Sequence, residues 1–143
     1  MRSFAALSIM SGLGAVLRAS GSKANVETFL RRTKWSPLSV FWRGKKRIEH
    51  SKSVSKINGF NVNISDAEGL ELPKQVKDAV RMLRRDAAEF RSLKRLKLHA
   101  VLDFAVELKD RDGPAFFRFP SELLRLLAKY ELSLEVSYYG SQP

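Results

Sequence analysis

The chain has 143 residues, of which 44% are hydrophobic, and its formal net charge is +11. This length and apolar content fit one folded domain and exclude a disordered tail. There is no cysteine, so a disulfide scaffold, a thiolate zinc site and a cysteine nucleophile are excluded. There are only two histidines. We therefore expect a single domain over residues 1–143, located in a reducing cytoplasm and carrying neither metal nor cofactor.

The N-terminal residues allow two interpretations. Residues 4–10 alternate in hydrophobicity, which predicts a first strand with Ala5, Leu7 and Ile9 on one face. The basic start and short apolar run also resemble a signal peptide, so the alternative is an exported protein if residues 1–20 are such a signal. No stretch approaches the roughly 18 apolar residues of a membrane span, and we expect no membrane contact.

Glycine, serine and alanine dominate residues 11–24, which predicts a loop. A short helix is expected over 25–34, with Asn25 as its N-cap and with Val26, Phe29 and Leu30 as its buried side. Trp35-Ser36-Pro37 ends the helix because the residue before proline disfavours helical backbone.

The middle of the chain predicts two strands and a long helix. The strands are expected at 38–42 and 59–65, joined by a basic and polar loop over 43–57. The helix is expected at 73–93, because its apolar residues recur at helical spacing and a proline stands in its first turn.

The C-terminal third predicts strands at 98–108 and 115–119, a helix at 121–130, a strand at 132–139 and a tail at 140–143. The turn after residue 108 would make 115–119 the hairpin partner of the preceding strand. Even-numbered strand residues, including Leu134 and Val136, would face the helices and close the core. The resulting class is α+β: a single domain with an antiparallel or mixed sheet of about five to six strands and helices packed on one face.

Three stretches resemble the bacterial domain-of-unknown-function family 4279. They are FAALSIMS followed by VETFLRRTKWSPLSV and WRGKKR; GFNVNIS before the long helix; and LDFAVEL with FRFPSELLRLLAKYELSLEVSYYG. Members of that family often close the third helix with glycine, where this chain has Tyr130-Glu131, and the 11–24 loop is distinctive. The resemblance implies a compact bacterial α+β domain with no known active site. Small bacterial domains of this kind are also similar to immunity proteins of toxin systems.

Strand alternation places a set of polar side chains on the sheet face opposite the helices. Paired carboxylates can perform acid–base chemistry when their pKa values are pushed apart, and histidine with carboxylates can bind a divalent metal. The structural alternative is an ordinary solvated sheet face with no function. The residues of this candidate site are Asn61, Asn63, His99, Asp103, Glu107, Glu135 and Tyr139, accompanied by Ser133 and Ser137.

A second candidate is basic. Residues 1–98 hold 21 Lys/Arg against eight acids, whereas residues 99–143 hold five against seven. Arginine and lysine neutralise phosphates and an exposed aromatic can stack on a base, whereas the structural alternative is a solvated turn with Trp42 in the core. The residues of this candidate patch, beside Phe41, are Trp42, Arg43, Lys45, Lys46 and Arg47.

No P-loop, dinucleotide-binding, zinc-protease or nucleophile-elbow motif is present in the sequence. We therefore predict a non-enzymatic binding domain whose partner is an unknown protein, in an immunity-like role as one option. Nucleic-acid binding through the basic N-terminal half is the alternative, and a carboxylate-based hydrolase on the open sheet face is another. A homodimer through the open face or an edge strand is also open, with Phe117, Tyr138 and Tyr139 as the aromatics of interest.

Overall fold

The computed structural model describes residues 14–68, 71–108 and 115–140, and the strand expected at 4–10 lies outside them. The elements in chain order are β1 (Val16–Gly21), α2 (Lys23–Arg32), β2 (Ser39–Phe41), β3 (Asn58–Asn63), α3 (Leu72–Arg85), α4 (Ala87–Arg95), β4 (His99–Leu108), α5 (Ser121–Lys129) and β5 (Ser133–Gly140).

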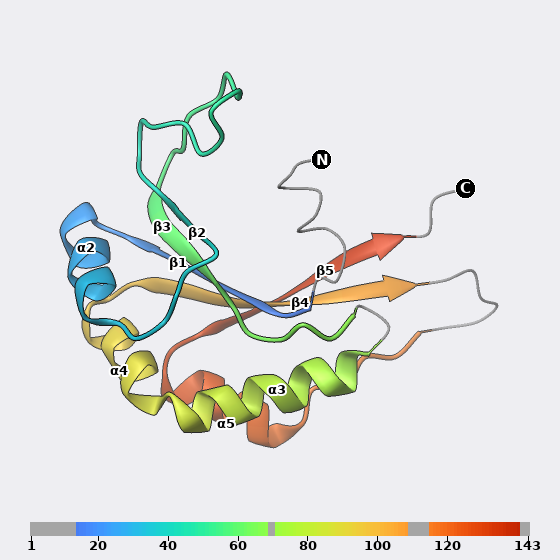
Figure 1. The fold of residues 1–143 in the computed structure, drawn as a ribbon. Helices are drawn as coiled ribbons and strands as arrows, with labels where there is room; N and C mark the ends of the chain where they lie inside the picture. The colour runs from blue at the N-terminus through green and yellow to red at the C-terminus, as the bar shows by residue number, and fades with distance from the viewer. Residues whose placement is uncertain (1–13, 69–70, 109–114, 141–143) are drawn as a thin grey trace.

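The five strands form one mixed sheet in the order β2-β3-β1-β4-β5. All neighbours are antiparallel except β4 and β5, which run parallel. One buried cluster joins the apolar side of the sheet to all four helices, so the helices lie on one face (Figure 1). The predicted α+β class, with a mixed sheet covered on one face, is therefore confirmed.

The central strand β1 occupies residues for which the sequence predicted a loop, so that prediction is wrong. Ala15, Leu17 and Ala19 are buried in the core, while Val16 and Arg18 alternate with them on the other face. Small side chains are usually read as loop formers, but here they permit close packing beneath the helices. The physical cause is pairing on both edges, with β3 on one side and β4 on the other.

Helix α2 begins two residues earlier than predicted. The N-cap is Ser22 rather than Asn25, because the Ser22 hydroxyl accepts a hydrogen bond from the Asn25 amide at 3.1 Å. The predicted buried side is confirmed: Val26 and Phe29 are buried and Leu30 packs partly against the core.

The predicted long helix is divided at Asp86 into α3 and α4. The Asp86 carboxylate is buried and accepts hydrogen bonds from Trp35 Nε1 at 2.9 Å and from the Arg85 guanidinium at 3.0 Å. Lys34 Nζ lies 2.9 Å from its Oδ1. Hydrogen bonding from Arg85 acts against burial and, with Lys34 and Trp35, lowers the pKa of Asp86 well below its usual range. This carboxylate thus ties the segment after α2 to the α3–α4 junction.

The strand expected at 115–119 is not formed. Strand β5 pairs with Val101–Leu108 and so occupies one edge of the part of β4 that a hairpin partner would use, while β1 pairs with His99–Asp103 on the other edge. The segment instead leads irregularly into α5, and Phe119 packs against Phe104 with ring centroids 5.3 Å apart. The helix and the closing strand that follow are confirmed.

The expectation that Leu134 and Val136 close the core is also wrong. Their partners Leu102 and Phe104 are buried on the helix side, but β5 is an edge strand and its own side chains remain 37% and 40% exposed. Within the described ranges, no helix is long and apolar enough to cross a membrane.

Helices α4 and α5 end in the same way. Leu98 N–H bonds to Leu93 O at 3.0 Å, and Leu132 N–H bonds to Leu127 O at 2.8 Å. These bonds define Schellman motifs, which need a left-handed residue just after the helix. The residues there are Lys97 and Glu131, both with φ of 55°. Glu131 therefore occupies the position at which related sequences were expected to carry glycine.

We predict that Glu131→Gly raises the free energy of unfolding by about 0.5–1 kcal/mol, because glycine adopts left-handed backbone without the Cβ clash. The exposed Lys94–Glu131 ion pair that is lost contributes little. Lys97→Gly should also raise the free energy of unfolding, whereas Lys129→Gly, inside α5, should lower it. Urea unfolding measures all three, and a destabilised Glu131→Gly variant would contradict the argument.

We predict that Asp86→Asn lowers the free energy of unfolding by about 1–3 kcal/mol at pH 7. The pKa of Asp86 is lower in the folded than in the unfolded chain, so its stabilisation is complete above about pH 4 and is lost as the pH falls further. The difference in the free energy of unfolding between wild type and Asp86→Asn should therefore become smaller below pH 4, as measured by urea titrations. The exposed Glu68→Gln serves as control and should change stability little.

Candidate functional site

The strand register brings part of the predicted polar set together on the sheet face away from the helices. Asp103 of β4 lies opposite Glu135 of β5, and Glu107 lies opposite Tyr139. Burial and the charge of Asp103 raise the pKa of the Tyr139 hydroxyl. This face therefore has its carboxylates on two neighbouring strands.

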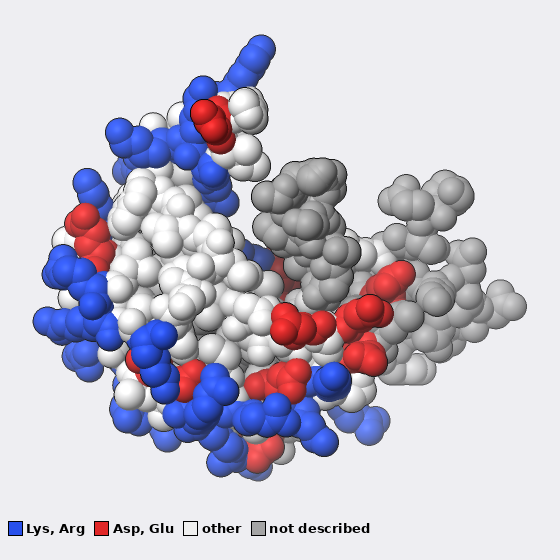
Figure 2. All heavy atoms as spheres, in the orientation of Figure 1, with Lys and Arg blue, Asp and Glu red and all other residues white. Residues whose placement is uncertain are grey.

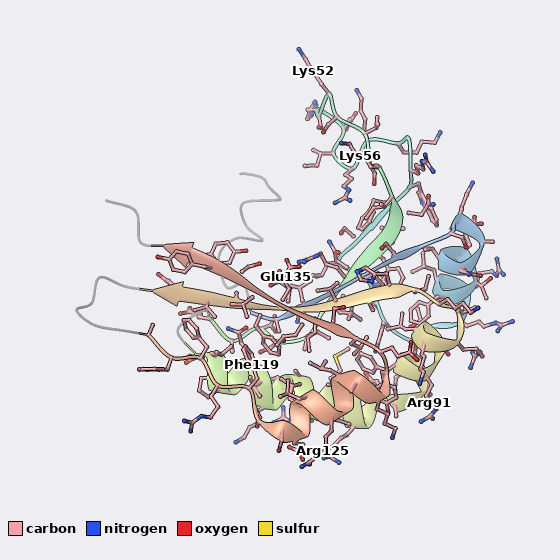
Figure 3. The ribbon with its side chains drawn as sticks, turned by 180° about the vertical axis from the view of Figure 1, so that it is seen from behind. Lys52, Lys56, Arg91, Phe119, Arg125 and Glu135 are labelled. Carbon is pink, nitrogen blue, oxygen red and sulfur yellow. The ribbon has the colours of Figure 1, made fainter. Side chains whose placement is uncertain are left out.

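Arg18 of β1, which the sequence analysis did not select, is the cation at the centre of this cluster. Its Nη1 lies 2.6 Å from Asp103 Oδ2 and its Nη2 lies 2.7 Å from Glu135 Oε1. Burial opposes the charge of Arg18, but the hydrogen bonds and charges of Asp103 and Glu135 outweigh it and raise the pKa of Arg18. Ser137 Oγ donates to the same Asp103 carboxylate, 2.8 Å from Oδ2. Figure 3 shows Glu135 on the side of the sheet away from the helices.

These contacts give the Asp103–Glu135 pair a structural character. Asp103 is 12% exposed at its side chain, and its carboxylate accepts from Arg18 and Ser137. A general acid–base pair needs one carboxyl held protonated by its surroundings. Here both carboxylates accept hydrogen bonds from one guanidinium, that of Arg18.

Of the other predicted members of the polar face, Asn61 lies beside the cluster, opposite Arg18 in the strand register, whereas His99 and Asn63 lie apart from it. His99 lies four residues from Asp103 along β4, which is about 13 Å at the usual rise of a strand, and it pairs with Ser20. Asn63 lies two strands from Asp103, across β1, and donates to Asp66. Asn61 donates to Ser39 at 3.0 Å. In the described part of the chain, no group of three or more His, Cys, Asp or Glu could hold a metal ion.

The predicted basic patch lies in a projecting loop. We call residues 43–57, between β2 and β3, the basic arm; it extends beyond the sheet in Figure 1. Its base is closed by backbone hydrogen bonds from Gly44 N–H to Ser55 O and from Ser55 N–H to Lys45 O, both 2.8 Å. Gly44 has φ of 81°, a conformation that favours glycine and lets the chain turn there.

The aromatic residues beside the arm are not available for stacking on a base. Phe41 is 5% exposed, and its ring is covered by the Arg47 guanidinium at 3.8 Å. A Cβ at Gly59 would lie 2.7 Å from this ring, so glycine there makes room for it. Trp42 is half-buried and packs against the core. The cations of the arm therefore have no fully exposed aromatic ring beside them at Phe41 or Trp42.

The arm carries one acid, Glu49, and six cations: Arg43, Lys45, Lys46, Arg47, Lys52 and Lys56. Among the residues that the structure describes, none of these cations takes part in an ion pair. Some cations on the helices are paired, such as Arg81 with Asp78 and Arg84 with Glu122, whereas others in the described residues, such as Lys74 and Lys77, take part in no ion pair. Figure 2 shows Lys and Arg on the arm and over the helices.

The arm also exposes aliphatic side chains. Ile48, Val54 and Ile57 are 55%, 48% and 45% exposed. Together with the cations, they give the arm a surface that is both charged and apolar.

Residues 11–141 match the family model described as Domain of unknown function (DUF4279). The chain belongs to the DUF4279 family. The DUF4279 match includes β1 and extends to the end of β5, so it contains both the Arg18 cluster and the basic arm. Most of the FAALSIMS stretch precedes it. Neither the curated proteins nor the solved structures gave a match.

We predict that Arg18→Met lowers the free energy of unfolding by about 1–2 kcal/mol, because Asp103 then stays largely buried without its cation. Glu135→Gln is the matched control. The side chain of Glu135 is 51% exposed, so this variant should lower the free energy of unfolding much less than Arg18→Met does. Urea unfolding at pH 7 compares the two variants. A larger loss for Glu135→Gln than for Arg18→Met would contradict this assignment.

Proposed function

We propose that this DUF4279 domain is a non-enzymatic binding domain that recognises an acidic surface of a partner protein through the basic arm. The observation that carries the proposal is the set of six arm cations without ion pairs in the described structure, next to three exposed aliphatic residues. Unpaired like charges on one loop repel one another, and an acidic partner relieves that repulsion.

The side chains of the arm favour a protein partner over a nucleic acid. Protein interfaces combine an apolar centre with a charged rim, and Ile48, Val54 and Ile57 can supply such a centre. Single-stranded nucleic acids are bound by aromatic platforms along a basic groove, but Phe41 is covered by Arg47 and Trp42 is half-buried. The cations would then steer the encounter and select an acidic partner.

The Arg18 cluster supports the non-enzymatic part of the proposal. The polar sheet face has its central carboxylate engaged by Arg18 and Ser137, which favours a structural role over hydrolysis. An immunity-like role is one setting for this function, in which the bound partner is a toxin with an acidic surface. Cytoplasmic location remains part of the same proposal.

A charge-reversal experiment tests the arm. In the arm variant, Lys45, Lys46 and Lys52 are replaced by glutamate; in the control variant, Lys23, Lys74 and Lys77, which are exposed on α2 and α3, are replaced by glutamate. Both variants have the same net charge. We expect nuclease-treated lysate of the source cells to yield a protein that binds wild type and control alike, and binds the arm variant about 10- to 100-fold more weakly.

The nucleic-acid alternative is measured with the same variants. Fluorescence anisotropy with mixed-sequence single-stranded DNA, duplex DNA and RNA at 50 and 200 mM salt should show no binding specific to the arm. A steep salt dependence that disappears in the arm variant would overturn the proposal in favour of nucleic acid. Equal loss of protein binding in both variants would also overturn it, because net charge rather than the arm would then be responsible.

A further inference from the structure

Strand β5 forms a long edge of the sheet. It spans eight residues, and among the residues that the structure describes no strand pairs with its outer side. The opposite edge, β2, has three residues. Exposed edges are usually blunted by short length, proline, a bulge or a charged side chain, because free backbone groups recruit another strand. The charged residue in β5 is Glu135, and Arg18 already binds it.

The side chains of β5 make this edge apolar on the helix side. Leu134, Val136 and Tyr138 are 37%, 40% and 61% exposed. Their partners on β4 are buried against the helices, so all three project to the helix side, at the rim of the core. An added strand would bury part of each of these side chains and satisfy the free backbone groups.

The charge distribution identifies the occupant. A chain of net charge +11 repels a second copy over most of its surface, but residues 99–143 carry two more acids than bases. The arm lies between β2 and β3, at the other edge of the sheet (Figure 1). Contact through β5 therefore joins two copies at their least positive side and keeps the basic residues of the arms apart.

We propose that β5 pairs with β5 of a second copy, antiparallel and about a two-fold axis, so that two sheets become one continuous sheet. An isologous contact of this kind needs a self-complementary strand. The sequence of β5 provides it in the register centred on Val136: Val136 faces Val136 of the other copy, Leu134 faces Tyr138, and Glu135 faces Ser137. A register centred on Ser137 would leave Leu134 opposite Gly140. A register centred on Glu135 would place two carboxylates opposite each other, which is unfavourable.

Cysteine trapping tests both the contact and the register, because the wild-type chain contains no cysteine. Under mild oxidation we expect Val136→Cys to form a disulfide-linked dimer, since equivalent residues at the axis lie within disulfide range. Leu134→Cys alone should not cross-link, but a mixture of Leu134→Cys and Tyr138→Cys chains should. Val40→Cys, on the opposite edge strand, is the control that should remain monomeric.

Sedimentation of the uncrosslinked full chain gives the second measurement. We expect wild type at 1–100 μM to approach twice the chain mass of 16.2 kDa. Val136→Lys should weaken the dimer at least about 10-fold, because lysine on an edge strand opposes pairing, while Val40→Lys should leave it unchanged. Circular dichroism confirms that both variants fold.

The proposal is overturned if the wild-type chain is monomeric at 100 μM, or if Val40→Lys rather than Val136→Lys dissociates the dimer. It is also overturned if Leu134→Cys cross-links and Val136→Cys does not. A monomer that instead binds a strand of another protein at β5 would also overturn it. None of these outcomes depends on the arm, so failure here is distinguishable from failure of the proposed function.

Discussion

A guanidinium placed on the central strand of the sheet requires partners, because a half-buried charge without them is costly. Arg18 finds them on the next two strands, at Asp103 and Glu135, so one side chain connects β1, β4 and β5. This requirement explains why acids line the face that no helix covers. Both carboxylates accept hydrogen bonds from this one cation. The polar face thus contains a network that links three neighbouring strands of the sheet.

Several cations of the helices have acidic partners within the fold, whereas the cations of the arm have none among the described residues. The carboxylates Asp78 and Glu122 each pair with an arginine of α3, and buried Asp86 collects three donors at the α3–α4 junction. Such contacts pair part of the positive charge of the helices within the fold. The six cations of residues 43–57 have only Glu49 among them and a backbone closed by its own hydrogen bonds. Among the described residues, this loop is closed by backbone hydrogen bonds and not by ion pairs of its cations.

The elements that could be predicted from the sequence are those in which apolar residues recur at strand or helix spacing and so mark the buried side. The even-numbered positions of residues 98–108 are all apolar, residues 59–65 alternate strictly, and residues 121–130 repeat at helical spacing, so β4, β3 and α5 were predicted with small boundary errors. Strand β1 was missed because Ala15, Ala19 and Gly21 resemble a loop, and only its place between β3 and β4 makes small residues suitable. The break at Asp86 was missed because the apolar stripe continues across it, while its cause, Trp35, lies 51 residues away in the chain. Arg18 was not predicted as a site residue because its partners, Asp103 and Glu135, are brought beside it by the strand order, which the residue pattern does not give.

The positions of the arm and of β5 at opposite edges limit how binding and self-association can be combined. From β2 to β5 the sheet has four strand spacings, about 19 Å at 4.8 Å each. Across a two-fold contact at β5, the two β2 strands would therefore lie roughly 43 Å apart, and the projecting arms would lie at the two ends of the joined sheet. A small acidic protein cannot reach both arms at once. A dimer of this kind would bind two separate partners, each with the affinity of one arm, or gain avidity only from a partner that is itself a dimer of matching span.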